Sequence, residues 1–311
     1  MRVVALLNVM AGSIEGSSGK EIREMVRSAL AARGIVCEVE VLPGGKLAHA
    51  ASRALQKAQR NEIDAIIAGG GDGTIHTVAA VLAGTGVKLG ILPFGTLNHF
   101  AKDLGIPMEL EGAVDVIAAA HAVNIDVGEV NGIVFVNNSS IGVYPYMVLD
   151  RQRLRRRGLQ KWAAVALAGL HMLRMFPIRR LRVRAEGWVE PCRTPSLFVG
   201  NNKYTLNLRA LRKRERLDKG ELWFYIVKHQ TRLSLLWFTL RSLLGLSDTE
   251  RDLRVFGAKR AEVSARRRKK RLAVALDGEV VFLRPPLHYR IRGGELRVYA
   301  PIPTERVEAT G

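Results

Sequence analysis

The stretch Ile66-Ile67-Ala68-Gly69-Gly70-Gly71-Asp72-Gly73-Thr74 constrains the fold of this chain more than any other segment. An apolar run of strand character at 63–68 ends in four glycines within five residues, and apolar residues at helical spacing follow from Thr74. A strand, a glycine turn and a helix together present backbone N–H groups and a helix N-terminus to an anion. The segment lacks the Gly-Lys-Ser/Thr of a P-loop and the spacing of GxGxxG. An ordinary tight turn is the alternative, but four glycines around one acid exceed what such a turn needs.

Strand-like and helical segments alternate through the first 120 or so residues. Apolar runs at 2–8, 35–42, 63–68 and 88–92 are each followed by a loop and a segment with helical periodicity. This order predicts a parallel sheet with helices on both faces, and ligands in such sheets bind beyond the carboxyl ends of the strands. The loops after Asn8, Ala68 and Leu92 share that edge. We therefore predict an α/β nucleotide-binding domain over residues 1–126.

The pattern changes after Asn124. Asn131-Gly132 lies between two apolar runs and predicts a hairpin. Further short strand-like runs with turn signals indicate an antiparallel β-sandwich over residues 127–311, whose last residues can pack back on the first domain. Two mostly apolar segments, 160–176 and 233–246, are expected to be helices within this second domain.

The net charge of +19 is unevenly distributed. Residues 1–128 hold 11 Lys and Arg against 13 Asp and Glu, whereas the remainder holds 37 against 16, so the second part carries all the excess. Such a field attracts a polyanion, either nucleic acid or an anionic membrane face. The basic cluster at 151–157 beside the apolar segment 160–176 suits an interfacial element, and a second cluster lies at 266–271. A basic surface that serves solubility alone is the alternative.

Two cysteines, Cys37 and Cys192, are too few for a disulfide framework or a Cys-rich metal site, which favours a reducing, cytoplasmic setting. The first residues read as a strand and lack the features of a signal peptide. Because no run of 18 apolar residues occurs, no membrane span is expected.

Three motifs in this order resemble the diacylglycerol kinase catalytic domain family, especially its bacterial soluble lipid kinases, with sphingosine kinases as more distant relatives. The motifs are Gly70-Gly71-Asp72-Gly73-Thr74, Pro93-Phe94-Gly95-Thr96-Leu97-Asn98 and the late Asp277-Gly278-Glu279. Gly200-Asn201-Asn202-Lys203-Tyr204 also looks like a family segment. The first motif alone is shared with NAD kinases, but the three together are much more specific.

The resemblance implies a nucleotide site in the first domain and catalysis in a cleft between the domains. ATP would be held by residues that match the family's phosphate and nucleotide loops: Asn8, Ala11, Gly12, Gly69, Gly70, Gly71, Gly73, Thr74, Thr96 and Asn98. Asp72 would orient the triphosphate through Mg²⁺ or a positioned water, because a lone carboxylate repels phosphate unless a cation intervenes. Glu279, with Asp277 beside it, would accept the proton of the attacking lipid hydroxyl. Taken without the family pattern, Asp277-Gly278 is an ordinary hairpin turn.

Two positions depart from the family pattern. His99 stands where many relatives carry an acid. Lys219 stands where relatives usually carry an acid in a loop that binds a structural magnesium, so its ammonium group could occupy the place of the cation. Asp218 is then the candidate ligand for a structural metal in this loop, with Glu221 the other nearby carboxylate.

The sequence thus favours an ATP- and Mg²⁺-dependent lipid kinase that phosphorylates a hydroxyl of diacylglycerol or a related lipid. Its substrate would lie in an anionic membrane surface, at which the protein would be peripheral on the inner face; no nucleic acid partner is expected, and a homodimer is compatible with the sequence. Two alternatives stay open. One is a soluble kinase resembling NAD kinase, and the other is a non-catalytic binder of anionic lipid or nucleic acid, which would leave Asp72, Asp277 and Glu279 without a purpose.

Overall fold

The computed structural model describes residues 1–8, 18–156, 178–186, 188–204, 214, 216–229, 231, 234, 237, 249–265 and 271–302. The helix expected at 160–176, most of the one expected at 233–246, and the predicted nucleotide contacts Ala11 and Gly12 lie outside these residues. The chain divides into two compact units, Met1–Ile125 with Glu295–Gly311, and Asp126–Gly294. Strands β5 (Ala122–Val130) and β16 (Leu287–Tyr299) each run from one unit into the other.

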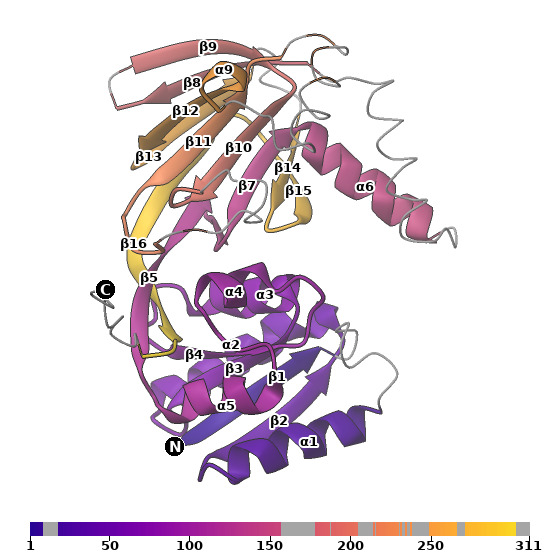
Figure 1. The fold of residues 1–311 in the computed structure, drawn as a ribbon, viewed down its shortest axis with the longest axis vertical. Helices are drawn as coiled ribbons and strands as arrows, with labels where there is room; N and C mark the ends of the chain where they lie inside the picture. Colours follow the sequence, from indigo (N-terminus) through magenta and orange to yellow (C-terminus); the bar gives the residue numbers. More distant parts are fainter. Residues whose placement is uncertain are drawn as a thin grey trace, which may run out of the picture. The chain divides into compact units, whose positions relative to one another are not determined.

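The first unit is built on a parallel sheet, as predicted (Figure 1). Its strands β1 (Arg2–Asn8), β2 (Val36–Leu42), β3 (Ala65–Gly70) and β4 (Lys88–Pro93) follow the order β2-β1-β3-β4. The end of β16 adds a further parallel strand beside β4, at Arg297 and Val298. The inner strands β1 and β3 are almost entirely buried, as expected for strands covered on both faces.

Helices connect these strands, most of them where the periodicity predicts a helix. They are α1 (Gly19–Ala31), the short 3-10 helix η2 (Gly44–Lys46), α2 (Leu47–Gln59), α3 (Asp72–Leu82), α4 (His99–Asp103) and α5 (Leu110–Ala118). Helix α1 illustrates why these segments form helices. Ser18 and Glu21 form a capping box at its start, and Ile22, Val26 and Leu30 are buried at a spacing of four residues. Helix α4 was not predicted from the sequence, where its residues read as part of a long loop.

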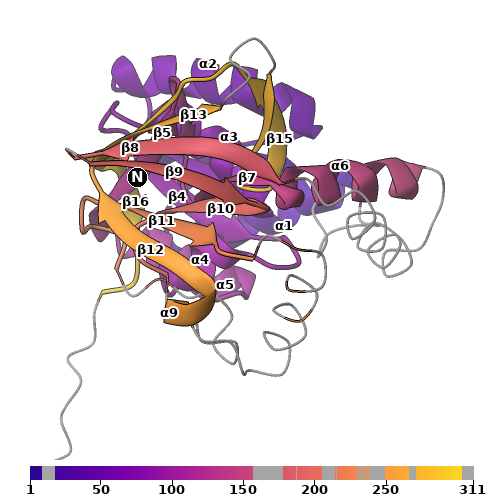
Figure 2. The same ribbon diagram turned by 90° about the horizontal axis from the view of Figure 1, so that it is seen from above.

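The second unit consists of two antiparallel layers (Figure 2). One is a six-stranded sheet in the order β12-β11-β10-β7-β14-β15, and the other follows β16-β13-β8-β9, with β5 beside β16 and β6 beside β5. The further strands are β6 (Ile133–Phe135), β7 (Asn138–Gly142), β8 (Arg179–Ala185), β9 (Trp188–Thr194), β10 (Ser196–Asn201), β11 (Leu222–Val227), β12 (Leu253–Ala258), β13 (Arg260–Ala265), β14 (Leu272–Leu276) and β15 (Glu279–Leu283). Helices α6 (Val143–Arg156) and α9 (Thr249–Asp252) complete the described elements.

The core of the second unit lies between these layers. One hydrophobic cluster includes Val183 and Val263 from the β16-β13-β8-β9 layer and Phe224 and Val274 from the six-stranded sheet. The hairpin predicted at Asn131-Gly132 joins β5 to β6, and both of its turn residues have positive φ angles. The fold class predicted from the sequence, an α/β unit followed by an antiparallel sandwich, is therefore confirmed. Among the described residues, no helix has the length and apolar character needed to span a bilayer.

Candidate active site

The glycine segment of the first unit forms the predicted strand–turn–helix. Strand β3 ends at Gly70, Gly71 is the extended N-cap residue, and the eleven-residue helix α3 begins at Asp72. No side chain of the N-cap residue covers the amide groups of the first helical turn. These amides and the positive end of the helix dipole lie at the carboxyl edge of the parallel sheet, where an anion can be bound.

Close packing explains several of the glycines. A Cβ atom on Gly69 would lie 2.2 Å from a side-chain carbon of Leu7, and one on Gly70 would lie 2.4 Å from Oγ1 of Thr74. A Cβ atom on Gly95 would lie 2.3 Å from the Cα atom of Gly71. The loops after β3 and β4 therefore touch through their backbones, so glycine at these positions follows from packing within the protein as well as from access for a ligand.

Asp72 joins the same two loops. Its carboxylate accepts hydrogen bonds from the backbone amides of His99 (3.2 Å) and Phe100 (3.1 Å), which begin helix α4. Both oxygens are thus used to hold the segment after β4 against the start of α3. The predicted role of Asp72 toward the triphosphate stays a prediction; what the geometry displays is a positioning role between the two family motifs.

Asn98 and Asn8 complete this edge of the sheet. Asn98 adopts a left-handed conformation (φ 50°), and its Nδ2 donates to the carbonyl oxygens of Pro93 (3.0 Å) and Gly95 (2.7 Å). Its buried Oδ1 has no hydrogen-bond partner among the residues that the structure describes. Asn8 Nδ2 donates to Thr74 Oγ1 at 3.1 Å. Thr96 is exposed. Of the predicted nucleotide contacts, the structure therefore brings Asn8, the glycine segment, Thr74 and Asn98 together.

In the second unit, Asp277-Gly278 is a two-residue hairpin loop. Leu276 and Glu279 are paired across it, and φ is 47° at Asp277 and 90° at Gly278, as in a type I′ turn. The carboxylate of Asp277 also accepts hydrogen bonds from the amides of three consecutive residues, 136–138, each at 2.8 Å. Three of its roughly four acceptor positions are thereby occupied. Asp277 therefore fixes the backbone that precedes β7.

Glu279 differs from its neighbour. It is exposed at the first position of β15, and no hydrogen bond or ion pair engages it in the part of the chain that the structure describes. Of the two carboxylates in the motif, Glu279 is the one available to accept a proton, while Asp277 anchors the turn that presents it. That Glu279 and Asp72 act on the same phosphoryl group stays a prediction.

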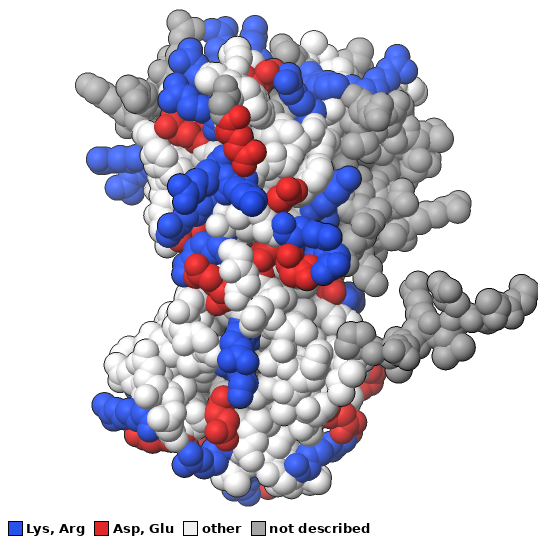
Figure 3. All heavy atoms as spheres, turned by 90° about the vertical axis from the view of Figure 1, so that its left-hand side faces the viewer, with Lys and Arg blue, Asp and Glu red and all other residues white. Residues whose placement is uncertain are grey.

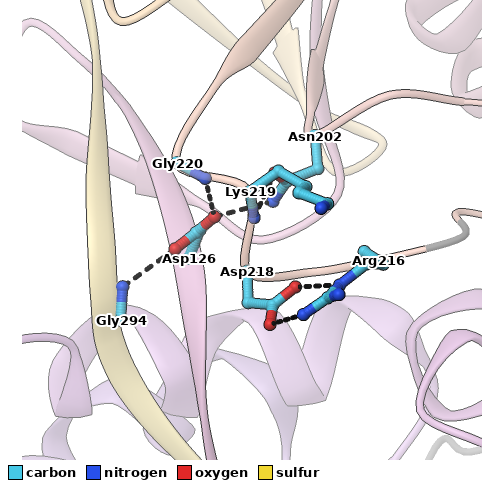
Figure 4. A network of polar contacts seen from close by, with 7 residues as sticks. All are labelled: Asp126, Asn202, Arg216, Asp218, Lys219, Gly220 and Gly294. Carbon is cyan, nitrogen blue, oxygen red and sulfur yellow. Dashed lines mark hydrogen bonds and ion pairs between the residues drawn. The ribbon is translucent and has the colours of Figure 1, made fainter.

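Asp126 is a buried acid that the sequence analysis missed (Figure 4). Its Oδ2 accepts from the amide of Gly220 (2.7 Å) and from Asn202 Nδ2 (3.0 Å), and its Oδ1 accepts from the amide of Gly294 (2.9 Å). Asn202 Oδ1 in turn accepts from the amide of Lys219 (3.0 Å). Three chain segments are thus tied to one carboxylate by neutral donors. Its signal in the sequence is an acid that directly follows Ile125 within the apolar run that becomes β5.

The same network bears on the predicted structural metal. Asp218 forms a bidentate pair with Arg216, at 2.8 and 2.6 Å, and this hydrogen bonding lowers the pKa of Asp218 (Figure 4). Within the described ranges, no group of three or more His, Cys, Asp or Glu side chains could hold a metal ion. The side chain of Lys219 is exposed, and its backbone amide takes part in the Asp126 network. These donors do not fit a divalent cation at Asp218.

Comparisons with known proteins agree with this architecture. Residues 2–130 match the family model described as the diacylglycerol kinase catalytic domain. Proteins named diacylglycerol kinase from Staphylococcus aureus strains JH9 and Newman are 28% identical over 216 residues, which cover 68% of this chain and 68% of each relative. A crystal structure of a diacylglycerol kinase from Bacillus anthracis str. Sterne covers 96% of this chain and 97% of its own, with a TM-score of 0.67 and 20% identity. Residues 2–130 therefore resemble the diacylglycerol kinase catalytic domain, and the chain as a whole shares the fold of the Bacillus anthracis protein.

Proposed function

We propose that this protein is a lipid kinase that transfers the γ-phosphoryl group of ATP to a hydroxyl of diacylglycerol or a related lipid at the inner face of a membrane. The proposal depends on one observation at the carboxyl edge of the parallel sheet. There Asp72 joins two glycine-bearing loops, and both loops lie within residues 2–130, which match the family model. Phosphoryl transfer depends mainly on positioning and charge stabilisation, and this edge supplies helix-terminal amides for both.

Different residues of this chain have different roles in the proposed phosphoryl transfer. The amides of Asp72 and Gly73 at the start of α3 bind phosphate oxygens, and the side chains of Asp72 and Asn98 hold the neighbouring loop in place. Mg²⁺ would arrive with the nucleotide and neutralise its phosphates, since it usually keeps several waters and takes only one or two protein carboxylates. Glu279 accepts the proton of the lipid hydroxyl, a role that contributes about 10²–10⁴-fold to the rate.

The experiment is a transfer assay with radiolabelled ATP and purified protein, in which diacylglycerol, a total lipid extract and NAD are offered separately. We expect a labelled lipid product from diacylglycerol or from the extract, and none from NAD. Labelled NAD without any lipid product would instead favour the soluble-kinase alternative. Absence of every product under conditions where ATP binds would overturn the proposal and leave the fold as described.

Matched variants connect the activity to the site. Glu279→Gln should lower the rate of lipid phosphorylation by about 10²–10⁴-fold. Glu111→Gln, which changes an exposed glutamate of the same charge on α5, should leave the rate unchanged. A non-catalytic binder would show no difference between these two variants in any transfer assay.

A further inference from the structure

Four neighbouring strands of the second unit turn a face rich in arginine toward solvent. They follow the order β16-β13-β8-β9, and their other face packs into the hydrophobic core through residues such as Val183, Val263 and Leu287. The cross-strand register determines which side chains share the outer face, because directly opposed residues point the same way. We call its arginines the arginine face: Arg180, Arg182, Arg184, Arg193, Arg260 and Arg290.

The positive charge of this face is least compensated at Arg180, Arg182 and Arg193. All six arginines are exposed, and only Arg290 forms an ion pair within the described part of the chain, with Glu129 at 2.8 Å. Glu129, Glu186 and Glu262 line one pocket together with Arg184, Arg260 and Arg290. The residues opposite Arg180 and Arg182 are instead Arg193, Pro191 and Ser264, none of which is acidic. In Figure 3, Lys and Arg side chains cover more of the second unit than Asp and Glu side chains do, and the acids lie among them.

Folding alone does not account for this arrangement. Arg180 lies directly opposite Arg193, and Arg260 directly opposite Arg290, although like charges in opposed positions destabilise a sheet. Charged side chains often protect an edge strand from unwanted pairing, but this reason applies to β9 and not to the interior strands β8 and β13.

The spacing of the strands arranges the arginines in a two-dimensional grid. Adjacent strands lie about 4.8 Å apart, and alternate residues of one strand about 6.8 Å apart, so the guanidinium groups spread in two dimensions. Arginine binds phosphate oxygens in a bidentate manner. A planar array of phosphate headgroups matches such a grid, whereas single-stranded nucleic acid is bound in a groove with stacked aromatic side chains. Exposed Val189 and Pro191 on β9 lie beside the arginines and add apolar contact area.

We propose that the arginine face docks the protein on an anionic phospholipid surface. The choice of a membrane over other polyanions rests on the proposed function, because a lipid kinase meets a substrate whose acyl chains stay in the bilayer. The binding itself does not require catalysis. Each arginine near an anionic surface is expected to strengthen binding about fivefold.

The test is co-sedimentation of the full chain with vesicles of phosphatidylcholine alone and with vesicles of equal parts phosphatidylcholine and phosphatidylglycerol. The variant Arg180→Glu/Arg182→Glu changes two exposed side chains without placing like charges in opposed positions, since they face Arg193, Pro191 and Ser264. Its matched control is Lys20→Glu/Arg23→Glu on the exposed side of α1, which alters the net charge equally. Thermal unfolding of both variants checks that they are folded.

We expect the unaltered protein to bind the anionic vesicles and not the neutral ones. The double variant on β8 should lose at least about 30-fold in affinity, and the α1 control should change by less than about threefold. Equal losses in the two variants would overturn the proposal, as would tighter binding of the unaltered protein to duplex DNA than to anionic vesicles at the same salt concentration.

A kinase assay in detergent micelles separates this proposal from the proposed function. The β8 variant should phosphorylate lipid in micelles at the rate of the unaltered protein but lose activity on anionic vesicles. If the unaltered protein forms no lipid product at all, the proposed function fails, while selective loss of vesicle binding in the β8 variant still supports the arginine face.

Discussion

The two carboxylates of the Asp277-Gly278-Glu279 motif do different things, although they lie only two positions apart. Asp277 accepts three backbone amides and holds a turn, whereas Glu279 is exposed. Hydrogen bonds to a charged group contribute about 1.5–3 kcal/mol, and surface substitutions away from such features usually change stability by less than about 0.5 kcal/mol. The structure therefore separates a positioning residue from a candidate base by the effects that their replacement should have.

We predict that Asp277→Asn lowers the free energy of unfolding by about 1.5–3 kcal/mol, since asparagine keeps the tolerance for positive φ but not the charge. Glu279→Gln should leave the free energy of unfolding nearly unchanged and reduce kcat by about 10²–10⁴-fold. Urea unfolding and steady-state kinetics of the two variants measure these effects. A stable, fully active Glu279→Gln protein would contradict the role given to Glu279.

The two cysteines give a prediction about pH. Burial raises the pKa of the Cys37 thiol to about 12 and that of Cys192 to about 11, from an ordinary value of 9.0. Because the thiolate is the reactive form, the folded protein should react slowly with a thiol reagent near pH 8, and the rate should rise about tenfold per pH unit until about pH 11. An unfolded chain loses these protons first, so stability should fall as the pH rises above about 9. Rapid labelling of the folded protein near pH 8 would refute this.

At the scale of elements, the loops after β3 and β4 touch through their backbones and leave no space for a side chain at Gly95. The Cβ atom of a Gly95→Ala variant would lie 2.3 Å from the Cα atom of Gly71. We predict that this variant separates the loops and lowers the free energy of unfolding by about 1–3 kcal/mol. Its affinity for ATP should fall as well. Gly45→Ala is the matched control, because no atom lies within 4 Å of the added Cβ. Thermal unfolding with and without ATP measures both effects. If the two variants behave alike, the loop contact has no such importance.

At the scale of elements, the sequence predicts those features that depend on residues close together in the chain. The alternation of strands and helices and the Asn131-Gly132 hairpin depend on neighbouring residues, and both were predicted. The turn at Asp277-Gly278 is equally local and was the interpretation of that motif without the family pattern. The contacts of Asp72 with α4 and of Asp126 with Gly220 and Gly294 join residues 27 to 168 positions apart, which no local pattern reveals. Helix α4 was missed because it has only five residues, too few for helical periodicity to show.

Over the whole molecule, strand β16 serves both units. Leu287 lies in the core of the second unit, whereas Leu296, nine residues later on the same strand, is equally buried but belongs to the first unit. All four tryptophans, Trp162, Trp188, Trp223 and Trp237, fall within the limits of the second unit. Tryptophan fluorescence therefore reports on one unit only, while far-UV circular dichroism reports on both.

This arrangement yields a paired prediction for Leu287→Ala and Leu296→Ala. Each removes a fully buried leucine, which typically costs about 2–5 kcal/mol. Leu287→Ala should shift the urea midpoint seen by tryptophan fluorescence, whereas Leu296→Ala should shift a transition seen by circular dichroism and leave the fluorescence midpoint in place. Because domains generally unfold as separate cooperative units, a split between the two probes is expected only for the second variant. Identical shifts of both probes in both variants would mean that β16 couples the two units into a single cooperative structure.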